Sequence, residues 1–325
     1  MLKNLNLLKS ITFFILLSLS TLHELSANSV EPNNQDVYSI SIDENQPRLA
    51  RVIYSFYPTD SLLYMGYGAS RLPDRWATFV SNLEAVNASG KTVEIDKKEG
   101  ASWIIKTSSS ERISLSYEVN LTHEDHHWNG GIDGAAYAKE WGVFYTGRSL
   151  FILNGEDKKD ISIHFSTPSD WKVTSSFYQI KGNSKAFSAK NSTALWQAMF
   201  FTGKHEELVV KREGFELVFA LGGEYIINQK EDFKMLAEGV FDYYIDLMGG
   251  LPKPPPGSEF KKSVVIVNPG KTTDGEVIGN NISILIEENG DEMSEMISRF
   301  IFAHEFFHLW NGKSFAPVGD DCEWF

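Results

Sequence analysis

The sequence predicts an α+β protein, in which an antiparallel β-sandwich or saddle-like domain precedes the beginning of an α/β domain. Two observations lead to this prediction. Residues 37–225 contain short segments in which apolar and polar residues alternate with a period of two, separated by turn residues. After residue 226 the spacing of apolar residues becomes helical and is interrupted by short apolar runs. The 325 residues are enough for about two domains.

The alternation that predicts strands is clearest in residues 38–42, 112–117 and 160–165. A period of two places one face of each strand on a core and the other face toward water. Turn residues lie between these segments, for example at 88–91 and 181–184. Many short strands joined by such turns are typical of an antiparallel sandwich or a saddle-like sheet.

The second domain begins with an apolar stripe at helical spacing, which predicts a helix over Glu231–Met248. Gly249 and Gly250 end this helix. The apolar run Lys262–Val267 predicts a buried strand, and Val277–Ile286 predicts another strand.

We expect a second, longer helix to begin after the turn at residues 288–291 and to run to about Asn311. Asn289, followed three residues later by Glu292, fits a capping box, and Gly312 supplies a C-terminal stop. Apolar residues occur all around this helix, at Met293, Met296, Ile297, Phe300, Ile301, Phe307 and Trp310. A helix without a polar face is expected to lie in a core.

The first residues have the composition of a secretory signal. Lys3 and Lys9 precede an apolar run of about 12 residues, which is shorter than the roughly 20 that span a bilayer. Cleavage is expected near Ala27, and an uncleaved N-terminal anchor is the alternative. The predicted organisation is a signal peptide at 1–27, a flexible lead-in at 28–36, the β domain at 37–225 and the α/β domain at 226–325. We therefore expect an exported protein, periplasmic or secreted, without stable membrane insertion after cleavage.

Charge and cysteine content restrict the possible partners and cofactors. A formal net charge of -13 argues against nucleic acid as a partner. The single cysteine, Cys322, excludes an intramolecular disulfide framework and a cysteine-rich zinc site. Any metal ion must therefore be held by histidines and carboxylates.

The long helix carries His304, Glu305 and His308 in the pattern His-Glu-x-x-His. A spacing of four residues places both imidazoles on one face, one turn apart, so two ring nitrogens can converge on one ion. Glu305 projects about 100° around the helix from His304, beside the metal position. We expect His304 and His308 to bind Zn²⁺, and Glu305 to act as the general base in peptide hydrolysis.

Each of the two histidine-containing segments also has an interpretation without a metal ion. In the first, His304 and His308 are core histidines that hydrogen-bond to backbone carbonyls; we favour zinc, because an unliganded buried pair would be costly. The second concerns the segment 123–128, which is rich in histidine and carboxylates. It is either a second metal site or a surface loop, and the adjacent His126 and His127, which point apart in regular structure, favour the loop.

The stretch 304–313, with Pro317 following, resembles the signature of the M61 glycyl aminopeptidase family of thermolysin-like zinc peptidases. Residues 167–173 and 144–151 are similar to segments of the N-terminal β domain of that family. The resemblance covers most of the mature chain and is most specific around the predicted zinc helix. It implies a thermolysin-like α/β catalytic domain, zinc as the cofactor, aminopeptidase-like activity and a peptide or protein substrate.

The chain departs from the family pattern in two places. The family's third zinc ligand is a glutamate on the next helix, and its spacing from His308 places it just beyond Phe325. We therefore expect an incomplete catalytic domain and a poorly active fragment, with Glu323 as an alternative third ligand. The family also has a Gly-rich motif whose glutamate binds the substrate's free amine. Glu276 is the nearest candidate for this role, although its surroundings differ from the motif, and an exposed turn carboxylate is the alternative.

A function from another class is also open. In this alternative, the chain is a non-catalytic exported binding or scaffolding protein with a vestigial metal site. Tight stoichiometric zinc binding together with peptide hydrolysis would favour the peptidase over this alternative. The sequence leaves the oligomeric state open.

Overall fold

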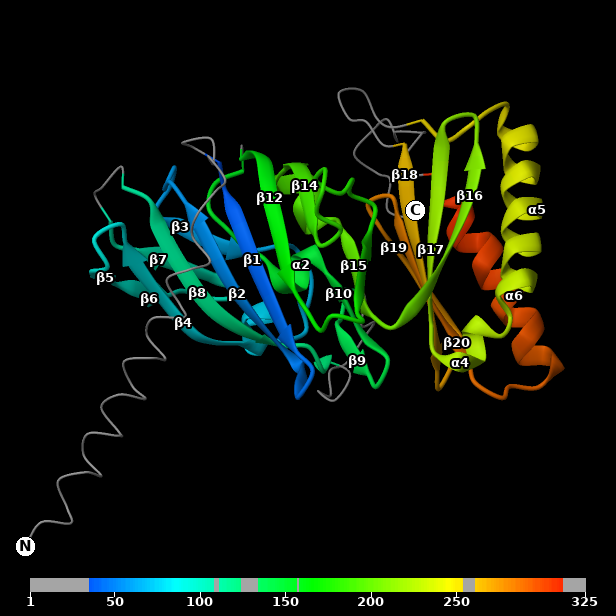
Figure 1. The fold of residues 1–325 in the computed structure, drawn as a ribbon, viewed down its shortest axis with the longest axis horizontal. Helices are drawn as coiled ribbons and strands as arrows, with labels where there is room; N and C mark the ends of the chain where they lie inside the picture. Colours follow the sequence, from blue (N-terminus) through cyan, green and yellow to red (C-terminus); the bar gives the residue numbers. More distant parts are fainter. Residues whose placement is uncertain (1–34, 108–110, 124–133, 157, 254–260, 312–325) are drawn as a thin grey trace, which may run out of the picture. The chain divides into compact units, whose positions relative to one another are not determined.

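The computed structural model describes residues 35–107, 111–123, 134–156, 158–253 and 261–311, which form the α+β protein that the sequence predicts (Figure 1). The predicted signal peptide and most of the lead-in lie outside the described residues. No helix in the described ranges has both the length and the apolar character needed to cross a membrane.

The first part of the chain forms one seven-stranded sheet and two four-stranded sheets. The seven-stranded sheet has the order β14 (Ala186–Asn191), β12 (Lys159–Ser166), β1 (Val37–Asp43), β2 (Gln46–Phe56), β8 (Ile113–Asn120), β4 (Val80–Asn87), β5 (Thr92–Val93). The second sheet has the order β13 (Lys172–Ser175), β15 (Met199–Gly203), β10 (Gly142–Thr146), β9 (Tyr137–Lys139). The third has the order β11 (Ile152–Leu153), β3 (Leu62–Met65), β7 (Ser102–Ile105), β6 (Ile95–Lys97).

The three predicted strands are confirmed as β1, β8 and β12, and all three belong to the seven-stranded sheet. Burial alternates along β8, as its period of two requires. The pairing of β1 with β12 is parallel, whereas the other pairs in this sheet are antiparallel. Short helical segments connect some of the strands: η1 (Arg75–Phe79), α2 (Gly147–Leu150) and α3 (Ser192–Trp196).

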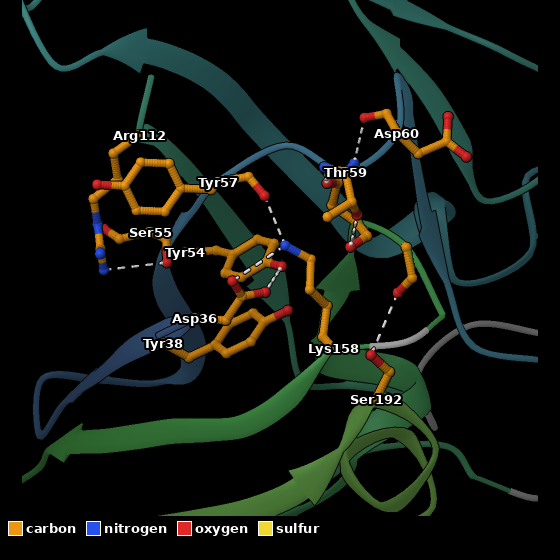
Figure 2. A network of polar contacts seen from close by, with 12 residues as sticks. Asp36, Tyr38, Tyr54, Ser55, Tyr57, Thr59, Asp60, Arg112, Lys158 and Ser192 are labelled. Carbon is orange, nitrogen blue, oxygen red and sulfur yellow. Dashed lines mark hydrogen bonds and ion pairs between the residues drawn. The ribbon is translucent and has the colours of Figure 1, made fainter. Parts of the chain in front are cut away.

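A buried polar network fixes the start of the first sheet (Figure 2). Tyr54 donates a hydrogen bond from its hydroxyl to Asp36 Oδ2 at 2.5 Å, and Lys158 Nζ lies 3.2 Å from Asp36 Oδ1. Lys158 also donates to the Tyr57 carbonyl oxygen at 2.7 Å. Burial raises the pKa of Asp36, while Tyr54 and Lys158 act to lower it. The charged groups are therefore paired and hydrogen-bonded where they leave water.

The second part of the chain is built on a five-stranded sheet of order β16 (His205–Arg212), β17 (Phe215–Gly222), β18 (Lys262–Gly270), β20 (Asn281–Glu287), β19 (Asp274–Ile278). β17, β18 and β20 run parallel, and the two edge strands run antiparallel to their neighbours. β16 and β17 lie before residue 225, so the pairings of this sheet cross the predicted domain division. The short helix α4 (Glu224–Ile227) follows β17.

Two long helices, α5 (Lys230–Met248) and α6 (Glu292–Phe307), cover one face of this sheet (Figure 1). Their buried side chains form a core with the parallel strands, to which Phe219, Ile284 and Phe302 belong. The other face of the sheet packs against residues of β9, β10 and β15, including Tyr137 and Phe201. The predicted helix over 231–248 and the predicted strand over 262–267 are confirmed as α5 and β18.

Two local predictions in this part were wrong, and a third falls on residues that the structure does not describe. The expected single strand over 277–286 is a hairpin, because the chain turns between β19 and β20 at Gly279, which has a φ of +62°. The N-cap of α6 is Asp291, whose side chain accepts a hydrogen bond from the Ser294 backbone N–H; the expected capping residue, Asn289, lies in the preceding turn with a φ of +60°. Gly312, the expected stop, lies outside the described residues.

The prediction that α6 is buried all round was also wrong. Phe306 and Phe302 face the core, but one side of the helix is exposed. Four large apolar residues share that exposed side: Met293, Met296, Ile297 and Phe300. Apolar composition alone cannot tell a core helix from a helix with an uncovered apolar face, since both have the same residues.

Candidate functional site

The predicted zinc-binding histidines lie at the C-terminal end of α6. His304 is in the last helical turn, and His308 is the C-cap residue with φ −64° and ψ −15°. The Nε2 atoms of the two imidazoles lie 3.3 Å apart, and the ring planes are inclined by 84°. The spacing of four residues therefore brings the two nitrogens close enough to bind the same ion, as the sequence predicts.

This separation matches the geometry of a tetrahedral zinc site. Two ligand nitrogens at about 2.0–2.1 Å from a zinc ion are about 3.3 Å apart when the angle at the metal is tetrahedral. The same distance also suits a hydrogen bond from one imidazole to the other. The helix C-terminus carries a partial negative charge, which favours a cation at this position. The donor set and its location thus fit a divalent metal ion.

Glu305 is buried, with a relative exposure of 6%, and its side chain packs against strand β19 at Gly275. A Cβ atom at Gly275 would lie 2.7 Å from Cγ of Glu305 and 2.8 Å from its Oε1. Only glycine leaves room there for the carboxylate, because real Cβ contacts are not this short. The backbone of the edge strand thus packs directly against the proposed base.

Glu276 is the next residue of β19, and it is half-buried rather than located in an exposed turn. Its Oε2 atom accepts a hydrogen bond of 2.6 Å from the backbone N–H of Gly134. Successive residues of a strand point to opposite faces, and Gly275 faces Glu305, so Glu276 points to the other face of β19. There it lines a small pocket together with Ala135, Tyr137, Asp274, Gly275, Ser283 and Leu285.

The structure therefore brings the four predicted site residues to the C-terminal end of α6 and the adjacent strand β19, but their side chains do not all converge. His304 and His308 converge with each other, and Glu305 lies against the strand that carries Glu276. The two carboxylates lie on opposite faces of that strand. Sequence reasoning missed Gly275 and Gly134; the only sign of Gly275 is a glycine between Asp274 and Glu276 in a strand pattern.

Contacts with α5 hold the end of α6 in position. The Tyr244 hydroxyl donates a hydrogen bond of 3.1 Å to the Ala303 carbonyl, next to His304. Beyond the helix, Trp310 is buried and its Nε1 donates a hydrogen bond of 3.0 Å to the Gly250 carbonyl. Both ends of the motif are thus tied to the neighbouring helix or to the turn that follows it.

Within the described ranges, no three histidines, cysteines or carboxylates cluster as a metal site. Glu323, the alternative third ligand, lies outside these ranges, as do His126 and His127. His123 is fully buried and stacks on Phe79 with ring centroids 3.7 Å apart.

The Nδ1 atom of His123 accepts a hydrogen bond of 2.9 Å from the Ala136 backbone N–H. This contact and the stacking on Phe79 make His123 part of the core of the first domain. The contacts of His123 therefore do not support a second metal site in the segment 123–128.

Comparison with known proteins locates one family match in the first part of the chain. Residues 70–203 match the Peptidase M61 N-terminal domain. The two family-like segments at 144–151 and 167–173 fall inside this range, whereas the His-Glu-x-x-His helix lies outside it. A search of curated proteins found no match.

Among solved structures, the chain is similar to an aminopeptidase N family protein from Idiomarina loihiensis, with a TM-score of 0.69 and 20% sequence identity. The similarity covers 87% of this chain and 49% of that protein, so this chain spans about half the length of the protein it matches. At this identity the similarity establishes a shared fold. It includes the greater part of the chain and is therefore not confined to the range of the family match.

Proposed function

We propose that this chain is part of a zinc-dependent peptidase of the M61 type, in which His304 and His308 bind the metal and Glu305 is the general base. The observation that carries the proposal is the 3.3 Å separation of the two Nε2 atoms, with Glu305 held beside them against Gly275. The family match in residues 70–203 and the fold shared with an aminopeptidase N family protein support the peptidase class.

Each residue has a distinct task in the proposed reaction. When bound, the zinc ion lowers the pKa of a water molecule and polarises the scissile carbonyl. Glu305 accepts the proton of the attacking water and delivers it to the leaving amine. Packing of Glu305 against the strand backbone restricts its side chain, so the carboxylate is oriented before substrate binds.

We place the third metal ligand outside the described residues, with Glu323 as the candidate in this chain. Zinc sites in peptidases use three protein ligands, so the chain on its own is expected to bind zinc weakly and to turn over little. A longer form of the chain that supplies a third ligand should bind zinc more tightly and hydrolyse peptides faster. An extended protein that binds no zinc stoichiometrically would instead favour the non-catalytic binding protein.

The decisive test of the mechanism is Glu305→Gln in the longer protein, with zinc content and peptide hydrolysis measured together. The variant should retain zinc, because Glu305 is not a ligand, and should lose about 100- to 10,000-fold in kcat, because the proton acceptor is removed. His304→Ala, as the matched control, should lose both zinc and activity. Retention of most of the turnover in Glu305→Gln would contradict the assigned role.

We propose Glu276 as the contact for the free amine of the substrate, which would make the enzyme an aminopeptidase. Its carboxylate is already held by the Gly134 N–H and points away from Glu305, so the substrate would have to reach around the edge of β19. Glu276→Gln should raise KM for substrates with a free amino terminus and leave N-acetylated substrates unaffected. Equal effects on both substrate classes would indicate an endopeptidase with a structural Glu276.

The predicted signal peptide gives the proposed location, which is periplasmic or secreted. Mass spectrometry of the mature N-terminus after expression in the source organism would test it. A new terminus near residue 28 is expected. An intact Met1 on protein from the membrane fraction would indicate the uncleaved anchor instead.

A further inference from the structure

A cavity of about 640 Å³ opens beside the sheet that contains β3 and β7. Its walls come from β3, from the loop 70–75 and from the turn 99–102 between β6 and β7. No residue of this cavity belongs to α6 or β19, so it is separate from the proposed metal site. Its volume lies within the range of small-molecule and short-peptide sites.

Three apolar residues of the cavity lining are nearly buried. Met65, Leu72 and Ala101 line the cavity and are 6%, 7% and 8% exposed. The backbone N–H of Met65 donates a hydrogen bond of 2.9 Å to the Ala101 carbonyl, which holds these two walls together. Such a floor can bury an apolar side chain of a ligand.

The rim carries two arginines in a chain whose net charge is -13. Arg71 has no ion-pair partner in the described part of the chain. Arg75 stacks its guanidinium over the Tyr67 ring, 5.9 Å from the centroid, instead of pairing with a carboxylate. The nearest acidic residue in sequence, Asp74, is paired with Lys97 at 3.3 Å.

Three other arginines of the described chain pair with carboxylates. Arg51, Arg212 and Arg299 each form an ion pair with a carboxylate. Arg71 and Arg75 instead line one cavity without a carboxylate partner among the described residues, in a chain that is acidic as a whole. Because they line the same cavity, an anionic ligand group can contact both.

Glu99 lines the same cavity and is exposed, without an ion-pair partner among the described residues. The cavity thus presents unpaired charges of both signs, with an excess of positive charge. A ligand with one carboxylate and one ammonium group can satisfy both kinds of charge.

One of these arginines has a strained backbone conformation. Arg75 has a φ of +46°, a conformation that is uncommon for a long side chain. Ala69, at the start of the same loop, also has a positive φ, of +50°. Strain of this kind is often found at binding sites. Gly100 lies under the Arg75 side chain, where an added Cβ would be 3.7 Å from Cδ.

We propose that this cavity binds a short zwitterionic peptide with an apolar side chain. Arg71 and Arg75 hold the peptide carboxylate, Glu99 faces its ammonium group, and Met65 and Leu72 contact the side chain. The inference does not depend on the proposed zinc chemistry, because no residue is shared. The exposed position of the three charged groups makes the binding sensitive to salt.

The test is calorimetric titration of the purified chain with leucyl-leucine in excess chelator, which removes any metal-dependent contribution. Two analogues separate the charges: leucyl-leucine amide lacks the carboxylate, and N-acetyl-leucyl-leucine lacks the ammonium group. We expect saturable binding of the dipeptide, at least tenfold weaker binding of the amide, and a smaller loss for the acetylated analogue. Absence of saturable dipeptide binding would overturn the proposal.

Substitutions of the charged cavity residues test whether the dipeptide binds in this cavity. Arg71→Gln and Arg75→Gln should each weaken dipeptide binding at least fivefold, and Glu99→Gln should remove the preference for the free amine. Arg51→Gln is the matched control, because it makes the same charge change at an arginine paired with Glu118 in the seven-stranded sheet. Unchanged binding in both cavity variants, or equal weakening in the control, would show that the cavity is not the site. Melting curves of all variants exclude unfolding as the cause.

Discussion

At the scale of single residues, Asp36 and Lys158 form a deeply buried charge pair, with side chains 3% and 11% exposed. Both ions make further hydrogen bonds, to Tyr54 and to the Tyr57 carbonyl (Figure 2). Removal of one partner from a buried pair leaves the other charge without compensation. The pair is therefore needed even if its net contribution to stability is small.

We predict that Asp36→Asn lowers the free energy of unfolding by about 3 kcal/mol, because Lys158 is left as an unpaired buried cation. Lys158→Met should cost a similar amount for the reverse reason. The double variant should recover part of the loss, which urea unfolding of the four proteins in a double-mutant cycle would measure. Strict additivity of the two changes would contradict the coupling.

At the scale of elements, the contact of α6 with β19 decides where Glu305 lies. The helix approaches the strand at a glycine, and Ile301 and Glu305 occupy the space that a side chain at Gly275 would need. Elsewhere α6 exposes apolar residues such as Met296 and Phe300, so its position depends on one packed face. The close approach at Gly275 is thus a main determinant of the geometry of the base.

Gly275→Ala should destabilise the fold by about 1–3 kcal/mol, because the added methyl group overlaps Glu305 and Ile301. In the longer protein it should lower kcat while zinc remains bound, because the base moves and the histidines do not. The matched control is Gly239→Ala in α5, where an added Cβ meets nothing within 4 Å. That change should stabilise the helix by up to about 1 kcal/mol. Thermal unfolding of both variants would check the opposite signs.

At the scale of the whole molecule, polar contacts connect the five-stranded sheet to the strands that precede it. Asn268 of β18 accepts a hydrogen bond from Trp141 Nε1 at 3.2 Å and donates one to the Tyr137 hydroxyl at 3.0 Å. His205 of β16 lies 2.6 Å, Nε2 to Oγ1, from Thr174 of β13. These side chains are buried or half-buried between sheets, so their protonation and pairing affect how the sheets pack.

The hydrogen-bond partners of His205 determine which of its ring nitrogens carries the proton. The Gly203 carbonyl can only accept, so Nδ1 carries a proton, and in the neutral ring Nε2 accepts from the Thr174 hydroxyl. Glu207 competes for that hydroxyl proton, and Lys172 also lies close, with its Nζ on the His205 carbonyl. Burial is the main cause that lowers the pKa of His205 to about 4.

We therefore predict a pH-dependent loss of stability from His205. Its folded pKa lies below the unfolded value of about 6.5, so the unfolded chain binds more protons between these values. The stabilisation is complete above pH about 6.5 and falls by about 3 kcal/mol as the pH drops toward 4. His205→Asn should lack this component, which urea unfolding at pH 7, 5.5 and 4.5 would reveal as a smaller slope. Parallel pH profiles for the two proteins would refute the prediction.

Only the part of the site whose geometry depends on residues close together in the sequence could be predicted. The His304–His308 pair was predictable because a spacing of four residues on a helix fixes the relative positions of two side chains. The position of Glu276 was not, because its partner, Gly134, is 142 residues away in the sequence. The break of the 277–286 segment into a hairpin had a local sign in Gly279, because glycine favours turns but also fits a strand pattern.

The sequence by itself determined the alternating strands of the first domain, the helical stripe of α5 and the convergence of two imidazoles at the end of α6. All three follow from periodicity, which depends only on neighbours along the chain. Only the tertiary structure decided that Glu305 packs on Gly275, that Glu276 faces the other side of β19, and that Arg71, Arg75 and Glu99 share a cavity. These arrangements depend on which distant segments meet, and the close packing of side chains between them is absent from any local pattern.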